Sequence, residues 1–153
     1  MKTIIILITL FISQFSFSQT KLDSLVMNEV NKIRDSIGVT NLTFSKDLFL
    51  KSDKNTKVIK QTGKVGHHST ETNNFPSGEI CNFVPTKVSK DCDSLKNIAK
   101  SIVSSWKSSP EHWKILTDPR WKFIGGSSLV VSQNYFCGKN MRYYDTYSSI
   151  NFK

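Results

Sequence analysis

The stretch of sequence that decides the fold lies at residues 94–116 and reads SLKNIAKSIVSSWKSSPEHWKIL. Its apolar side chains recur at intervals of three and four residues, the spacing of one face of a helix: Leu95, Ile98, Ala99, Ile102, Val103 and Trp106. Ser109 and Pro110 then begin a second, short helix, because serine is a favoured N-cap and proline fits the first helical position. The regular stripe predicts that Trp106 belongs to the core and not to a ligand site.

Two strands are predicted after this pair of helices. Residues 122–132 and 141–152 are rich in β-branched and aromatic side chains, and the turn-forming residues 138–140 lie between them. We therefore expect an antiparallel hairpin. The second run carries Tyr143, Tyr144 and Tyr147. We interpret these tyrosines as cross-strand packing residues, and a platform for sugars is the alternative that the sequence leaves open.

Two further helices are predicted before the deciding stretch. The first covers about residues 22–37 and ends at Gly38, and the second runs from Lys46 to about Gln61. Ser45 can cap the start of the second helix and Gly63 lies beyond its end. The apolar face of this second helix is thin, since polar side chains lie between its few apolar ones.

The segments between these helices predict the rest of the architecture. Residues 41–44 form a short extended piece, residues 63–78 a long polar loop, and residues 79–84 a strand that Pro85 stops. Long loops in compact domains are often functional. The order of helices followed by mixed strands and helices predicts an α+β fold, with helices packed on an antiparallel sheet.

The start of the chain has the pattern of a secretory signal peptide. Lys2 precedes an apolar run at residues 4–12, and Ser16 and Ser18 supply small residues before Gln19. The run is too short to cross a bilayer, which needs about 20 residues. We predict that residues 1–18 are removed and that residues 19–153 form one domain, without a transmembrane segment, in a secreted or periplasmic protein.

The charge and the cysteines limit the classes of partner and site. The chain has a formal net charge of +9, which favours anionic partners, but export argues against nucleic acid. Export also permits a disulfide, and three cysteines allow three single pairings. Because Cys81 and Cys92 enclose a short polar segment, we predict that they pair and leave Cys137 free.

Five short motifs occur in the order found in one family. They are Asn31-x-x-Arg34, His68-Ser69, Gly78-Glu79, Trp106-x-x-Ser109-Pro110-x-His112 followed by Ile115-Leu116, and Ile124-Gly125-Gly126. Together the motifs resemble those of the CAP superfamily, which includes cysteine-rich secretory and plant pathogenesis-related proteins. The resemblance implies a three-layer α-β-α sandwich with a cleft on one side.

The resemblance also implies a functional site. This chain carries only part of the residues that the family has there. The resemblance transfers His68, Glu79 and His112 to the cleft, and these three are expected to converge. Ile80 replaces the asparagine that follows Gly-Glu, Ser109 stands where eukaryotic members have a second glutamate, and Trp113 stands where arginine is common. His67 is the neighbour that the motif does not select, and we expect it to be exposed.

The chemistry of this trio leaves several functions open. Two neutral imidazoles, His68 and His112, can bind a divalent metal such as zinc, with Glu79 as a third ligand or as a group that orients a histidine. Without metal, a His–Glu pair can act as general acid and base. The resemblance favours a binding module for metal, lipid, sterol or a wall-derived ligand. A metal-dependent hydrolase and a structural or antagonistic protein that acts through its basic surface are the alternatives, and no catalytic residue can be named.

Overall fold

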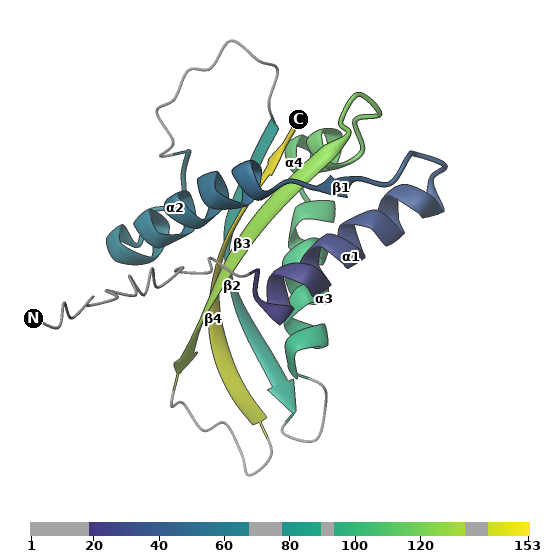
Figure 1. Ribbon diagram of the computed structural model, residues 1–153. Coiled ribbons are helices and arrows are strands. Elements are labelled where there is room, and N and C mark those ends of the chain that lie inside the picture. The colour runs from purple at the N-terminus through teal and green to yellow at the C-terminus, as the bar shows by residue number, and fades with distance from the viewer. Residues whose placement is uncertain (1–18, 68–77, 90–93, 134–140) are drawn as a thin grey trace, which may run out of the picture.

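The computed structural model describes residues 19–67, 78–89, 94–133 and 141–153. In these segments, four helices cover the two faces of one four-stranded sheet, which gives an α-β-α sandwich (Figure 1). Helix α2 (Lys46–Thr62) packs on one face, and α1 (Lys21–Ser36), α3 (Ser94–Lys107) and α4 (Pro110–Leu116) lie on the other side. Among the described residues, no helix has both the length and the apolar character to cross a membrane. The predicted α+β architecture is confirmed.

The sheet has the strand order β1-β3-β4-β2. Strands β3 (Phe123–Gln133) and β4 (Met141–Phe152) form the predicted antiparallel pair, and β2 (Gly78–Ser89) pairs antiparallel with β4. The two-residue strand β1 (Thr43–Phe44) lies parallel to the start of β3. The sheet is antiparallel across β2, β4 and β3, as predicted, and the short parallel strand β1 makes it mixed at this edge. A two-residue strand carries too little pattern to reveal its direction.

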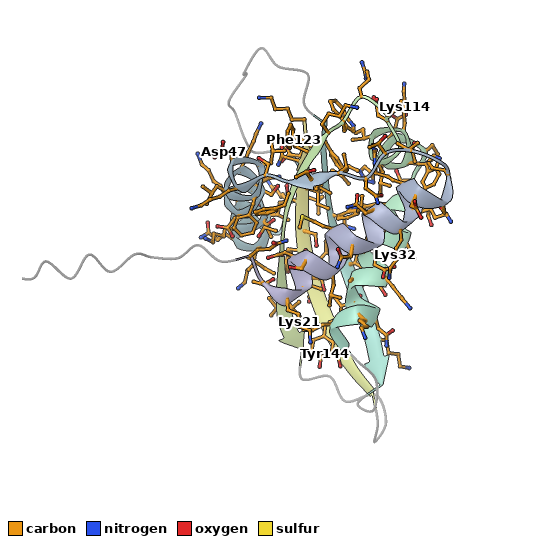
Figure 2. All side chains as sticks on the ribbon, turned by 45° about the vertical axis from the view of Figure 1, so that its right-hand side comes forward. Lys21, Lys32, Asp47, Lys114, Phe123 and Tyr144 are labelled. Atoms are coloured by element: carbon orange, nitrogen blue, oxygen red, sulfur yellow. The ribbon has the colours of Figure 1, made fainter. Side chains whose placement is uncertain are left out.

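The apolar core lies between the sheet and the layer of α1 and α3. Trp106 and Ile102 of α3 are fully buried there, as the stripe at residues 94–116 predicts, and Val30 of α1 packs in the same cluster. From the sheet, Ile80 and Ile150 pair across β2 and β4 and are both buried in this core. Figure 2 shows side chains filling the space between these layers, while Lys32 lies on the outer side of α1. Ile80 is thus a core side chain at the position where the resemblance leads us to expect asparagine.

The opposite face of the sheet meets α2 through polar contacts. The side chains that α2 buries are Phe49, Ser52, Asn55, Thr56 and Ile59. Three of these five are polar, which explains the thin apolar face of the helix in the sequence. Ser52 Oγ donates to the carbonyl of Gly125 at 2.6 Å, and the Thr56 hydroxyl donates to the carbonyl of Ser127 at 3.1 Å. The helix is therefore held to the sheet by hydrogen bonds as well as by packing.

Gly125 allows α2 to approach the sheet this closely. A Cβ atom at this position would lie 2.1 Å from the backbone nitrogen of Phe49, a distance that no real side chain could adopt. The glycine of the Ile124-Gly125-Gly126 motif is therefore required by the contact between helix and strand.

Strand β2 continues through Pro85, which corrects the prediction that this proline ends the strand. Pro85 pairs with Asp145 in the middle of the β2–β4 ladder. In β3, the carbonyl of Ile124 faces away from β4, because it accepts from Ser45. Paired residues of antiparallel strands turn their backbone groups either toward each other or away from each other, so this orientation is carried across β4 to β2. It places the nitrogen of Pro85 on the outer side of β2, where no other described strand lies. Proline is tolerated on an edge strand in this orientation.

The ends of α2 and α4 carry the cap residues that the sequence predicts. Ser45 is the N-cap of α2 and accepts from the backbone of Leu48, and Gly63 ends the helix in the left-handed conformation. Ser109 is the N-cap residue of α4, with Pro110 at the first helical position, but its side chain makes no capping hydrogen bond.

Candidate functional site

Glu79 is the centre of the polar layer between α2 and the sheet. Its Oε1 atom accepts hydrogen bonds from Asn55 Nδ2 at 3.0 Å, Ser149 Oγ at 3.1 Å and Asn151 Nδ2 at 3.3 Å. The carboxylate keeps only 12% of its side-chain surface exposed. Because three donors share one oxygen atom, the carboxylate is fixed in position and its second oxygen is free for another partner.

Local structure explains why these donors meet Glu79. Glu79 pairs with Asn151 across β2 and β4, so both side chains point toward α2. Ser149 lies two residues before Asn151 and therefore on the same face of the strand. Asn55 comes from the buried side of α2 and also donates to Ser149 Oγ at 3.2 Å. The sequence analysis named Glu79 but missed these donors, whose only signal was a set of polar residues at inward positions.

The second oxygen of Glu79 contacts the loop that follows α2. Glu79 Oε2 lies 2.8 Å from Nδ1 of His67, whose ring remains 62% exposed. His67 is exposed, as expected, and its ring also contacts Glu79. The motif pointed to His68, which lies outside the described residues. With Nδ1 against the carboxylate, the Nε2 atom of His67 is left for another partner.

His112 lies on α4, three positions after the N-cap Ser109, and is half-buried. Burial and the positive charge of His67 lower the pKa of His112, and Glu111 partly offsets them. The two imidazoles are thus near enough to interact electrostatically, and the neutral form of His112 is favoured. The convergence of His68 with Glu79 and His112 stays a prediction. Within the described part of the chain, no group of three or more His, Cys, Asp or Glu side chains is arranged to hold a metal ion.

Cys81 lies beside this site on β2. Its thiol is buried, and burial together with the charge of Glu79 raises its pKa to about 11, although a hydrogen bond from the Gly66 backbone acts in the opposite direction. A thiol with so high a pKa is a poor nucleophile at neutral pH. Cys92 and Cys137 lie outside the described residues, so the pairing of Cys81 with Cys92 stays a prediction.

The Asn31-x-x-Arg34 motif has a structural role away from Glu79. Arg34 is fully buried and donates to backbone carbonyls of Thr40 at 2.9 Å, Leu116 at 2.9 Å and Asp118 at 3.0 Å. Asn31 makes a reciprocal pair of hydrogen bonds with the backbone of Leu42. Together the two side chains fix the segments that follow α1 and α4, which positions the short helix that carries His112.

Comparisons with known proteins agree with this geometry. Residues 27–151 match the model of the cysteine-rich secretory protein family, CAP. An outer surface protein from Borrelia burgdorferi has a similar structure, with a TM-score of 0.62, 16% identity, and coverage of 89% of this chain and 96% of that chain. An extracellular protein containing an SCP domain from Bacillus anthracis has a TM-score of 0.54 and 15% identity, over 86% of this chain and 39% of that chain. No curated protein matches the chain.

Proposed function

Because the chain belongs to the cysteine-rich secretory protein (CAP) family, we propose that it is an exported binding module whose ligand site is centred on Glu79. The observation that carries the proposal is the anchoring of one carboxylate by three buried donors, with its other oxygen on an imidazole. Such an arrangement fixes an exposed His67 ring in one orientation. A preorganised ring of this kind can present a nitrogen to a ligand at little entropic cost.

The ligand that best fits the donor set is a divalent transition metal such as zinc. Neutral imidazole is a favoured zinc ligand, and a carboxylate behind a metal-binding histidine fixes its tautomer. Glu79 is placed for that supporting role toward His67. His112, whose pKa is lowered chiefly by burial, would supply a second nitrogen, and His68 or water would complete the coordination.

Thermal unfolding in the presence of zinc tests this function. A metal that binds only the folded state stabilises it, so zinc should raise the Tm, and magnesium, which prefers oxygen ligands, should not. His112→Ala and His67→Ala should abolish the increase, and Glu79→Gln should weaken it. The exposed Lys60→Ala on α2 is the matched control and should behave as the parent does.

The histidine variants also decide which neighbour in the loop serves the site. If His68→Ala abolishes the zinc response and His67→Ala does not, the family motif identifies the ligand and the role given to His67 is wrong. If all three histidine variants keep the full response, the metal proposal fails. Zinc binding should weaken in acid, because the imidazoles must be deprotonated to bind.

A metal-dependent hydrolase is the second candidate, and the His67–Glu79 pair is the observation that favours it. An imidazole oriented by a carboxylate can accept a proton from water. A binding module and a hydrolase differ in one respect that can be measured, since only the hydrolase would release products from an ester or amide substrate in a zinc-dependent manner.

A further inference from the structure

The outer edge of β3 is covered over only part of its length. The parallel strand β1 pairs with Phe123 and Ile124. Farther along, Asp23 Oδ1 accepts the backbone N–H of Ser128 at 2.7 Å, which closes the edge beside the start of α1. In the described part of the chain, the N–H and C=O of Val130 have no partner on this side. Figure 1 shows the end of β3 without a neighbouring strand or helix along its outer side.

The direction of these backbone groups follows from the ladder. The carbonyl of Ile124 and the N–H of Ser128 both face away from β4, since they bond Ser45 and Asp23. Because backbone groups alternate sides along a strand, those of Val130 and Ser132 face outward too. With respect to the described residues, the end of β3 therefore presents unpaired donors and acceptors in the spacing that a further antiparallel strand requires.

The opposite edge of the sheet has features that prevent such pairing. Pro85 offers no N–H on the outer side of β2, and the exposed Lys87 follows it two residues later. Proline and lysine are common means by which edge strands avoid association. The segment Leu129–Gln133 on β3 has neither, and it carries no charge.

An apolar row extends to this open edge on the face that carries α2. Phe83 of β2, Tyr147 of β4 and Leu129 of β3 lie side by side in register. The Phe83 and Tyr147 rings pack with centroids 5.1 Å apart, and Phe83 is 41% exposed. A strand added at β3 would place one of its side chains directly beside Leu129 and so cover the end of this row.

We propose that the end of β3 is a self-association edge, at which a second copy of this chain pairs antiparallel about a two-fold axis at Val131. In this arrangement Val130 of one copy faces Ser132 of the other, and the two symmetric pairs form about four backbone hydrogen bonds. A second copy fits because its edge offers the same donors and acceptors. The uncharged segment also brings no like charges into contact, although the whole protein carries a net charge of +9.

Sedimentation of the purified protein over a range of concentrations tests the proposal. The weight-average mass should rise toward twice that of the monomer. Val130→Pro should remain monomeric, because it removes the outward N–H and leaves the bonds to β4 intact. Val130→Thr keeps the N–H and the branched shape, so this matched control should still associate.

Amide hydrogen exchange keeps the proposal testable even if the proline variant folds poorly. In the parent protein, exchange of the Val130 amide should slow as concentration rises, whereas the Val131 amide, which faces β4, should be protected at every concentration. A monomer whose Val130 amide exchanges freely throughout would overturn the proposal. A monomer with a protected Val130 amide would also overturn it and would place another segment of the same chain on the edge.

Discussion

The two carboxylate oxygens of Glu79 bind different parts of the molecule. One oxygen joins α2 to β4 through Asn55, Ser149 and Asn151, and the other holds His67. A single side chain thus links the packing of a helix to the orientation of an exposed imidazole. Removing its charge in Glu79→Gln should affect both, which is why the metal response of that variant must be compared with its stability.

The pKa of His112 leads to a prediction about stability and pH. Burial and the charge of His67 hold this pKa below its ordinary value of 6.5, so between the folded pKa and 6.5 the unfolded chain binds more protons than the folded one. The contribution of His112 to stability is therefore complete above 6.5 and is lost as the pH falls through this window. In His112→Gln, the Tm should decrease less than in the parent between about pH 7 and pH 5.

A control for the pH experiment is available on α2. Lys60→Gln removes an exposed charge that does not titrate in this range, so its pH profile should parallel that of the parent. Parallel profiles for the parent and His112→Gln would contradict the assigned role of burial at His112.

Single residues of the site were predictable only in part. Glu79 and His112 could be named because each lies in a motif. The choice between His67 and His68 could not be made from the sequence, since neighbouring loop residues point in directions that the loop conformation decides. The amide and hydroxyl donors to Glu79 come from α2 and β4, and their meeting depends on strand register and on the close approach at Gly125.

At the scale of the elements, the two serine N-caps provide a matched comparison. Ser45 accepts a hydrogen bond from the Leu48 backbone at a long 3.5 Å, and Ser109 makes no side-chain capping bond. Ser45→Ala should therefore lower the free energy of unfolding by about 0.5–1 kcal/mol, and Ser109→Ala should change it by much less. Urea unfolding of both variants measures this difference. Equal losses would show that capping at α2 does not depend on the serine hydroxyl.

The long helices and strands were predicted well because each is marked by a pattern within its own residues. The stripe of α3, the glycine after α2 and the β-branched and aromatic runs of β3 and β4 are all local patterns of nearby residues. The prediction failed at Pro85 because the effect of proline depends on which side of the strand faces a neighbour. It also missed the parallel direction of β1, which is fixed by pairing with β3, some 80 residues later in the chain.

At the scale of the whole molecule, we predict that the protein is exported after cleavage of its first 18 residues. Lys2, the apolar run and Ser16 and Ser18 favour cleavage before Gln19. N-terminal sequencing of protein recovered from the medium or periplasm should therefore begin at Gln19. A membrane-bound chain that retains Met1 would contradict this expectation.

The two faces of the sheet bury different kinds of surface. The face toward α1 and α3 buries an apolar cluster that includes Trp106 and Phe152, whereas the side chains that α2 buries are polar in three cases out of five. Exposure of apolar surface raises the heat capacity and exposure of polar surface lowers it. Detachment of α2 alone should therefore have a small heat-capacity signature. Because Asn55 leaves Glu79 in the same event, we expect α2 and the site to open together while the α1–α3 layer stays folded.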